Sequence, residues 1–111
     1  MNILFVCSRN RWRSPTAEAI FKTSQVHTAK SAGTEPSARI RLTAKLIAWA
    51  DIIFAMEKRH KQRMMENFAF ETDGKQIVIL NIPDEYQYMD VELVESIKSS
   101  VSPYLDNVQE G

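Results

Sequence analysis

The sequence predicts an α/β fold, a three-layer αβα sandwich built on a four-stranded parallel sheet. Three short apolar runs and one weaker strand candidate alternate with segments of helical periodicity, and this alternation is typical of βαβ units. The runs are apolar at successive positions, as expected for strands that helices cover on both faces. The chain has 111 residues, of which 44% are hydrophobic and 25% are charged. We therefore expect a single domain that spans residues 1–111.

The first half of the chain is expected to supply two strands and two helices. The run Ile-Leu-Phe-Val that follows Asn2 is long enough for a central strand. Ser14 is a suitable N-cap, and Pro15 suits the first position of a helix. The elements expected here are a strand over 2–6, a helix that starts after Ser14 and continues to Ser24, a weaker strand over 28–32 that Gly33 ends, and a helix over 42–50.

The second half of the chain alternates in the same way and ends in a helix. The elements expected here are a strand over 51–56, a very basic helix over about 57–68, a turn over 71–75, a strand over 76–81, a loop over 82–88 and the last helix. Apolar residues with three-and-four spacing continue along the last helix as far as Val108. Pro103 lies inside this pattern and is expected to kink or end the helix, because proline lacks an amide hydrogen.

The net charge is zero, but the two parts of the chain are oppositely charged. Residues 1–63 hold 12 Lys and Arg against 4 Asp and Glu, whereas residues 64–111 hold 2 against 10. A basic first part favours an anionic ligand, such as phosphate or nucleic acid. Attraction between the two parts, or simple solvation of the charges, is the alternative explanation. Composition does not decide between them.

Composition also excludes several classes of protein. No apolar run approaches the ~20 residues that a membrane-spanning helix needs. The N-terminal run lacks the basic leader of a secretion signal. The single cysteine, Cys7, can form no internal disulfide and cannot supply the several thiolates of a structural zinc site. We therefore expect a cytoplasmic protein with no membrane partner.

The position of Cys7 indicates which chemistry the protein can carry out. Cys7 ends the first predicted strand and a helix begins seven residues later, so the loop between them lies where ligands bind in open α/β sheets. The N-terminus of that helix offers free N–H groups and a partial positive charge to an anion, and it favours the thiolate form of a nearby cysteine. Arg13 can present a planar fork to two phosphate oxygens. A buried free cysteine at a strand end is the simpler alternative.

Four segments of the chain carry a resemblance to a known family. They are VCSRNRWRSPTAEAIF at 6–21, KSAGT at 30–34, ADIIFAM at 50–56 and IPDEY at 82–86. In their order, and in the spacing Cys-x5-Arg-Ser-Pro, these segments resemble the low-molecular-weight protein tyrosine phosphatases. The resemblance implies that family's fold, with a phosphate-binding loop between the first strand and the first helix.

The resemblance also implies catalytic roles for four residues. Cys7 would be the nucleophile that forms a cysteinyl-phosphate, and Arg13 would bind the phosphate oxygens. Ser14 would donate a hydrogen bond to the thiolate in addition to capping the helix. Asp84 would be the general acid and later the general base, whereas its neighbour Asp90 is expected to cap the last helix.

Other residues are assigned to binding or to support. The residues implied in phosphate or substrate binding are Ser8, Arg9, Asn10, Arg11, Trp12 and Tyr86, of which Tyr86 either rims the cleft or packs against the fold. Asn10 is expected to adopt left-handed backbone angles, and Ser31 resembles a family position that hydrogen-bonds to the loop. His27 and His60 are interpreted as surface or structural residues. We expect no metal and no other cofactor, because the arginine and the loop amides supply the positive field.

The chain departs from the family pattern at several positions. Glu85 stands where the family usually has proline in its acid loop, and Trp12 replaces a second cysteine that often protects the first from oxidation. Arg9 and Arg11 replace small or aliphatic residues, and the segment over 34–42 lacks the usual longer insertion beside the cleft. The resemblance therefore predicts the reaction chemistry of this chain better than it predicts the substrate.

The expected function is phosphomonoester hydrolysis, with protein phosphotyrosine as the substrate. Phosphoserine and phosphoarginine are alternative substrates, and a non-catalytic phosphate-binding or nucleic-acid-binding module is the alternative outside enzymes. An arsenate reductase of the same fold is disfavoured because its thiol relay needs further cysteines. The expected partners are a phosphorylated protein or a small aryl phosphate, with inorganic phosphate or sulfate able to occupy the loop. A nucleic-acid partner is disfavoured.

Overall fold

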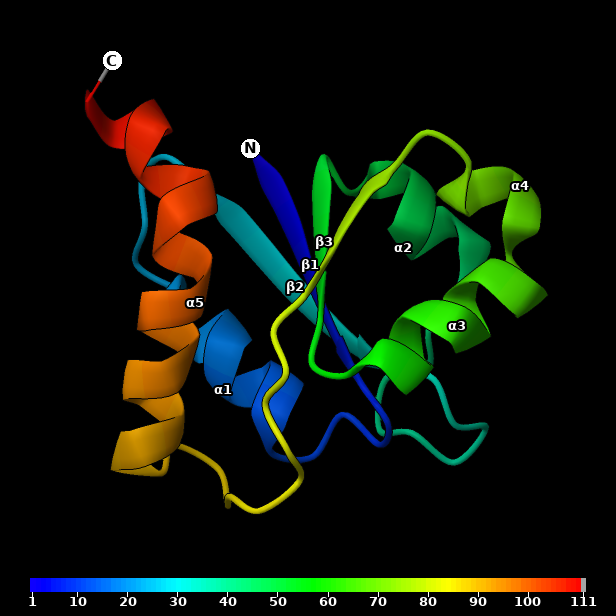
Figure 1. Cartoon of the computed structure of the whole chain (residues 1–111), viewed down its shortest axis with the longest axis horizontal. Helices are drawn as coiled ribbons and strands as arrows, with labels where there is room; N and C mark the ends of the chain where they lie inside the picture. Colours follow the sequence, from blue (N-terminus) through cyan, green and yellow to red (C-terminus); the bar gives the residue numbers. More distant parts are fainter. Residues whose placement is uncertain (111) are drawn as a thin grey trace.

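A parallel four-stranded sheet runs through the centre of the molecule in the computed structural model, which describes the backbone of residues 1–110 and the side chains of residues 1–105 (Figure 1). The strands are β1 (Asn2–Cys7), β2 (Thr28–Gly33), β3 (Ile52–Ala55) and β4 (Gln76–Ile79). Their spatial order is β2-β1-β3-β4, and all three pairings are parallel. The predicted sheet is confirmed.

Helices cover both faces of this sheet. Figure 1 shows α1 (Arg13–Ile20) and α5 (Val91–Glu110) on one face, and α2 (Ala44–Trp49), α3 (Lys58–Asn67) and α4 (Ala69–Thr72) on the other. Each layer of helices packs against its own cluster of buried apolar side chains. The arrangement is the predicted three-layer αβα sandwich.

β1 is buried on both faces and forms the rigid centre of the fold. Alternate residues of a strand point to opposite faces, so Ile3 and Phe5 enter the cluster beneath α1 and α5, while Leu4 and Val6 enter the cluster beneath α2 and α3. The Phe5 ring stacks on the ring of Phe54 with centroids 5.5 Å apart. Tight packing of this kind gives a strand little freedom, and it therefore fixes the position of the residue that ends it.

The carboxyl end of β1 is the point where the sheet topology reverses. From β1 the chain crosses to β2 on one side, and it then returns to β3 on the other side. Crevices that bind ligands open at such switch points in α/β sheets. Cys7, the last residue of β1, pairs with Gly33 of β2 and lies at this point. The loop over residues 8–12, called the Cys7 loop below, leads from it into α1.

α1 differs from its predicted bounds at both ends. Its N-cap is Trp12, and Ser14 lies in the first turn, so the prediction that Ser14 caps the helix is wrong. The hydroxyl of Ser14 instead faces the sulfur of Cys7 and accepts from the side-chain amide of Asn10, so it is engaged within the loop and does not cap the helix N-terminus. The helix ends at Ile20 and does not continue to the predicted Ser24.

The elements of the α2–α4 layer agree with the predictions in place but are shorter. Thr43 caps α2 through a 3.2 Å hydrogen bond from the Leu46 amide, so the predicted start at residue 42 is two residues early. Glu57 is the N-cap of α3 rather than its first residue. Part of the predicted turn over 71–75 belongs to the short helix α4, and Gly74 then reverses the chain with a φ of +77°.

α5 begins at a capping aspartate, as predicted. The Oδ1 atom of Asp90 accepts hydrogen bonds from the amides of Glu92 at 2.9 Å and Leu93 at 3.4 Å. These are amides that the helix itself leaves without a partner. The capping role expected for Asp90 is confirmed.

α5 does not end at Pro103 but continues to Glu110. Val101 and Leu105 on either side of the proline are buried in the core. Their apolar packing stabilises the helix at the point where the proline, which has no amide hydrogen, removes one backbone hydrogen bond. The side chain of Val108 lies outside the described residues. In the described part of the chain, no helix is both long enough and apolar enough to span a membrane.

Gly33 is required where β2 passes the Cys7 loop. A Cβ atom at this position would lie 2.5 Å from the carbonyl oxygen of Ser8 and 2.6 Å from the Cβ atom of Ala38. Such distances are impossible without movement of the backbone. The absence of a side chain at Gly33 therefore lets β2 approach the loop closely.

We expect Gly33→Ala to displace the Cys7 loop and to cost about 1–3 kcal/mol of unfolding free energy, because the added methyl group overpacks a backbone contact. Gly74→Ala is the matched control: it strains a positive φ, but no atom lies within 4 Å of the added Cβ. Urea unfolding and amide NMR spectra measure both effects. Unchanged signals from the loop amides in Gly33→Ala would contradict this account.

Candidate active site

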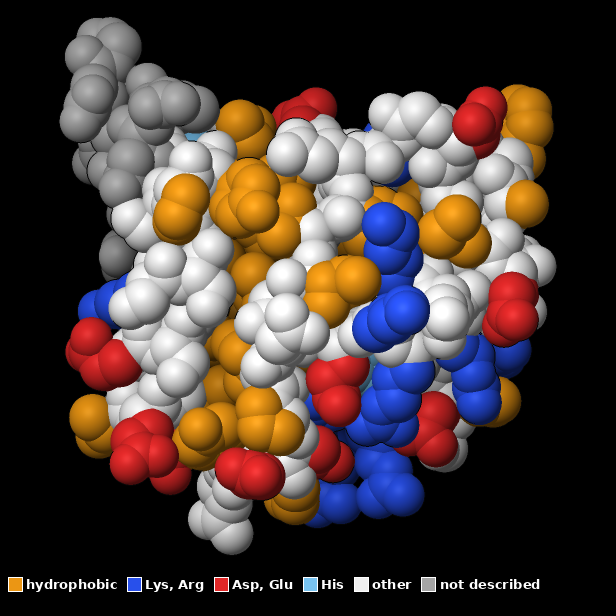
Figure 2. Space-filling model, in the orientation of Figure 1, with side chains coloured by type: hydrophobic (Ala, Val, Ile, Leu, Met, Phe, Trp, Pro, Cys, Tyr) orange, Lys and Arg blue, Asp and Glu red, His pale blue; other side chains and the backbone are white. Residues whose placement is uncertain are grey.

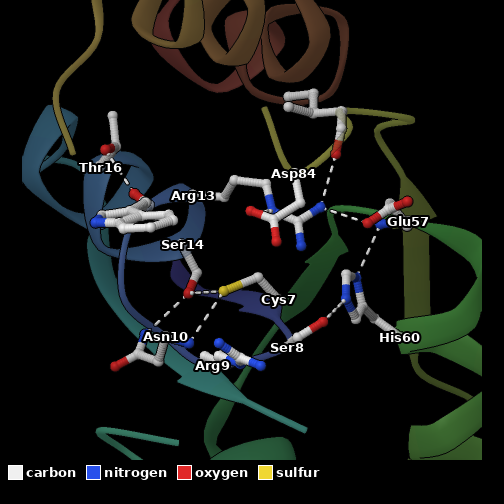
Figure 3. Close-up of polar contacts among 12 residues, drawn as sticks. Cys7, Ser8, Arg9, Asn10, Arg13, Ser14, Thr16, Glu57, His60 and Asp84 are labelled. Atoms are coloured by element: carbon white, nitrogen blue, oxygen red, sulfur yellow. Dashed lines mark hydrogen bonds and ion pairs between the residues drawn. The ribbon is translucent and has the colours of Figure 1, made fainter. Parts of the chain in front are cut away.

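The sulfur of Cys7 is buried at the base of the Cys7 loop and faces two hydrogen-bonding groups. The Oγ atom of Ser14 lies 2.9 Å from the sulfur, and the backbone amide of Asn10 donates to it at 3.2 Å (Figure 3). A hydroxyl and an amide that converge on one sulfur stabilise negative charge there. The structure therefore brings Cys7, Asn10 and Ser14 together, as the sequence predicts.

Asn10 holds the loop in its curled form. Its φ is +55°, in the left-handed region that asparagine tolerates better than most residues, and its side chain is fully buried. The side-chain Nδ2 donates to the hydroxyl of Ser14 and to the hydroxyl of Ser31, each at 2.8 Å. The left-handed backbone expected for Asn10 and the hydrogen bond expected between Ser31 and the loop are confirmed.

The direction of these hydrogen bonds determines what Ser14 can do. Because the two hydroxyls accept from the Asn10 amide, each is free to donate its own hydrogen onward. Ser31 donates to a carboxylate oxygen of Glu18 at 2.5 Å, and Ser14 is then oriented to donate to the sulfur of Cys7. Glu18 thus anchors the network from α1, a role that the sequence did not reveal.

The guanidinium of Arg13 is buried and held on one side by oxygen atoms. Its Nη1 donates to a carboxylate oxygen of Glu57 at 2.5 Å and to the carbonyl oxygen of Ile82 at 2.9 Å. An Oδ1 atom of Asp84 lies 3.7 Å from Nε. Only 2% of the Arg13 side chain is exposed, so the position of its charge is fixed before any ligand arrives.

Glu57 remains ionised beside this arginine. Burial acts to raise the pKa of Glu57, but hydrogen bonds from Arg13 and Arg59 and the charges of both arginines outweigh it, so the pKa lies below its usual value. The Arg59 guanidinium approaches from the exposed side at 3.0 Å. Glu57 therefore fixes the buried arginine by charge as well as by geometry.

His60 ties the Cys7 loop to the first turn of α3. Its Nδ1 accepts the backbone amide hydrogen of Glu57 at 3.0 Å, so in the neutral ring the hydrogen resides on Nε2. That Nε2 lies 2.9 Å from the hydroxyl of Ser8 and donates to it. Burial, and then the charges of Arg13 and Arg59, lower the pKa of His60 to about 4. The structural role expected for His60 is confirmed, and its partner is the Cys7 loop.

Asp84 lies over the same pocket as Cys7. The loop that carries it is held by hydrogen bonds from the Ile82 amide to the Met56 carbonyl and from the Met89 amide to the Thr16 hydroxyl, both 2.9 Å. Its side chain is 53% exposed, which suits a group that exchanges protons with solvent. The pocket, of about 30 Å³, is lined by Cys7, Ser8, Arg9, Arg11, Trp12, Arg13 and Asp84. A buried water occupies ~10–15 Å³ on this measure, so the space suits a small anion.

The two loop arginines line the pocket and have partners of their own. Arg9 is exposed and pairs with Glu35 at 3.4 Å, and the Arg11 guanidinium lies 4.8 Å from the centre of the Trp12 ring. Both form the rim of the pocket. Tyr86 is half-buried and packs against the apolar cluster beneath α5, and it does not line the pocket.

The face of the molecule around the pocket is basic. Figure 2 shows Lys and Arg side chains gathered over α3 and the Cys7 loop, while acidic side chains gather over the start of α5. The exposed bases of α3 include Lys58, Arg59 and Arg63. The opposite charges of the two parts of the sequence therefore lie side by side on this face, with the pocket on the basic side.

We expect His60→Gln to flatten the dependence of stability on acid pH. Because the folded-state pKa of His60 is lowered to about 4 from the usual 6.5, the unfolded chain binds more protons between these pH values. The unfolding free energy of the wild type should therefore fall as the pH is lowered from about 6.5 to about 4. Urea unfolding across this range measures the slope, and equal slopes for wild type and His60→Gln would contradict the assignment.

Comparison with known proteins agrees with this geometry. The model of the family "Low molecular weight phosphotyrosine protein phosphatase" matches residues 2–45, which include β1, the Cys7 loop, α1 and β2. No match was found among curated protein sequences. The comparison with solved structures extends over nearly the whole chain.

Three solved structures illustrate this. A mutant of YwlE from Bacillus subtilis is 25% identical over 96% of this chain and 99% of its own, with a TM-score of 0.71. The YwlE arginine phosphatase from Geobacillus stearothermophilus is 22% identical over 98% and 93%, with a TM-score of 0.77. A low molecular weight protein tyrosine phosphatase from Streptococcus pyogenes is 20% identical over 96% and 91%, with a TM-score of 0.78. The predicted resemblance is thus confirmed: residues 2–45 match the model of the low molecular weight phosphotyrosine protein phosphatases, and nearly the whole chain is similar in fold to solved members of that family.

Proposed function

We propose that the protein is a cysteine-dependent phosphatase that hydrolyses phosphomonoesters on proteins. One observation carries the proposal: a sulfur with two converging donors, a buried arginine and a half-exposed carboxylate share one pocket of anion size. The family match over residues 2–45 supports the same chemistry. A module that only binds phosphate has no use for a nucleophile beneath the anion or for an acid above it.

In the first step the Cys7 sulfur attacks the phosphorus of the substrate. The S–P bond forms as the bond from phosphorus to the leaving oxygen breaks, and Asp84 gives its proton to that oxygen. Arg13 and the amides of the Cys7 loop hold the remaining phosphate oxygens, on which negative charge is concentrated. Because Arg13 is already immobilised, little reorganisation accompanies the reaction.

In the second step water attacks the cysteinyl-phosphate. Asp84, now a carboxylate, accepts a proton from the water, while the S–P bond breaks and releases inorganic phosphate. The sulfur leaves as a thiolate, and the hydroxyl of Ser14 and the amide of Asn10 stabilise the charge that returns to it. Apart from the substrate and the water molecule, every group that takes part in these two steps is a residue of this chain.

The basic rim supports phosphotyrosine as the substrate. Arg11, stacked on Trp12, offers a flat cationic surface beside the pocket on which an aromatic ring can lie. Phosphoarginine is the second candidate, because the similar YwlE structures include an arginine phosphatase. The guanidinium of phosphoarginine is itself cationic, however, and exposed Arg9 and Arg11 at the rim disfavour it.

We expect the wild type to hydrolyse para-nitrophenyl phosphate without added metal and in the presence of a chelator, because fixed donors take the place of a cation. Cys7→Ser should reduce turnover to the uncatalysed background. Release of nitrophenolate measures both. Activity that disappears in chelator and returns with a divalent ion would overturn the mechanism, and so would a fully active Cys7→Ser variant.

We expect Asp84→Asn to lower turnover by about 10²–10⁴-fold, since the leaving oxygen loses its proton donor. The defect should be larger for phenyl phosphate than for nitrophenyl phosphate, whose leaving group departs without protonation. Asp90→Asn is the matched control: it alters a helix cap that contributes about 1 kcal/mol to the unfolding free energy, and it should leave turnover unchanged. Steady-state kinetics with the two substrates measure the difference. An equal loss of turnover in Asp84→Asn with phenyl phosphate and with nitrophenyl phosphate would exclude Asp84 as the acid.

A further inference from the structure

A second and much larger cavity lies beside the phosphate pocket. Its volume is about 570 Å³, within the range of ligand-binding clefts, whereas the phosphate pocket has about 30 Å³. The two share one lining residue, Arg11, which therefore stands at the junction between them. A substrate held by its phosphate beside Cys7 can reach the larger cavity past this side chain.

The floor of this cavity is one face of α1. Pro15, Glu18, Ala19 and Lys22 line it, and their spacing of three and four residues places them on a single side of the helix and its C-terminal extension. α1 has eight residues, so the floor is about 12 Å long. An extended chain advances ~3.3 Å per residue, so about four residues beyond the phosphorylated one span it. The cavity is called the α1 groove below.

Segments distant in sequence form the walls of the α1 groove. Arg39 stands near its inner end, where its Nε donates to the Asn10 carbonyl at 3.1 Å. Tyr88, from the loop that carries Asp84, is 54% exposed. At the outer end lie Thr28 and Ala29 of β2, which is an edge strand of the sheet. The groove thus runs from the Cys7 loop to a sheet edge, and it is open to an extended peptide.

The charges of the α1 groove favour an acidic occupant. Arg11, Lys22 and Arg39 line it against one carboxylate, that of Glu18, which already accepts a hydrogen bond from Ser31. His27 at the outer end adds no charge, because burial, and then the N-terminal amine, lower its pKa. The balance of ionised side chains along the groove is therefore positive.

We propose that the α1 groove binds the polypeptide that flanks the phosphorylated residue of a protein substrate, and that it selects acidic residues there. This inference rests on the proposed phosphatase function and names the class of substrate. The small pocket holds the phosphate, and Arg11 lies between phosphate and flank. Specificity for a phosphoprotein over a small phosphomonoester then comes from contacts along α1, at a distance from the reacting atoms.

The test compares Lys22→Glu with Lys98→Glu. Lys22 is an exposed lining residue of the groove with no part in catalysis, whereas Lys98 is exposed on α5 outside the groove and undergoes the same change of charge. The substrates are para-nitrophenyl phosphate and two phosphotyrosine peptides that differ only in Asp or Lys residues over the four positions on each side. Measured kcat/KM values for each pair decide the outcome.

The wild type should prefer the Asp peptide. Lys22→Glu should lower kcat/KM for that peptide by about three- to tenfold, since an attraction between partly exposed charges becomes a repulsion, and should leave para-nitrophenyl phosphate unaffected. Lys98→Glu should behave as wild type with every substrate. An equal response of the two peptides to Lys22→Glu, or an equal loss in Lys98→Glu, would overturn the inference while the phosphatase function stands.

Absence of all hydrolysis by the wild type would instead contradict the proposed function. Binding of the two peptides to the Cys7→Ser variant, measured by calorimetry with and without Lys22→Glu, then decides the role of the groove separately. Weaker binding of the Asp peptide in the double variant supports the groove, and unchanged binding rejects it. A single-stranded RNA that binds through Lys22 more tightly than the Asp peptide would also reject it.

Discussion

The side-chain amide of Asn10 is the interaction on which the candidate site depends. With one nitrogen it donates to two hydroxyls, one in the first turn of α1 and one on β2, and its own backbone amide points at the sulfur of Cys7. The backbone at Asn10 must adopt a positive φ for these contacts to form together. The loop therefore curls with its donors inward because a single buried residue connects both of its sides.

A second set of contacts holds the loop from outside. The first turn of α3 presents Glu57 to the buried guanidinium of Arg13, and His60 to the hydroxyl of Ser8. A buried guanidinium without its carboxylate partner carries a desolvation penalty of ~3–5 kcal/mol, so the ion pair is needed wherever the arginine is buried. The same helix turn therefore orients the loop's arginine and anchors the loop's first residue. Glu57 and His60 are not among the residues that line the small pocket beside Cys7, so they act on it through Arg13 and Ser8.

The fold was predictable because its signals are local. Three of the four strands contain a continuous apolar run, and the switch to polar residues after Cys7 marks the functional loop within one stretch of sequence. The capping role of Asp90 could be predicted for the same reason. The prediction for Ser14 was wrong because serine favours the N-cap position, whereas in the structure its hydroxyl contacts the sulfur of Cys7. Pro103 does not end α5, because burial of its neighbours outweighs one lost hydrogen bond.

The contacts that support the site were not predictable, because they join residues far apart in the chain. Arg13 and Glu57 are 44 positions apart, and Ser8 and His60 are 52 positions apart. The spacing of Glu57 and His60, three residues apart after an apolar run, does resemble a capping box and could have marked the start of α3. It could not have shown that this turn faces the Cys7 loop. The α1 groove depends in the same way on side chains from α1, β2 and the four loops that contain Arg11, Lys22, Arg39 and Tyr88.

Under the proposed mechanism, Cys7 carries the phosphoryl group during turnover. Rapid-quench kinetics with para-nitrophenyl phosphate, followed by mass spectrometry of the acid-stopped protein, test it most directly. We expect a burst of nitrophenolate that matches the enzyme concentration when the second step is the slower one, with one phosphoryl group on the peptide that contains Cys7. A phosphoryl group on any other residue, or turnover that never yields a phosphorylated protein under any quench condition, would contradict the account.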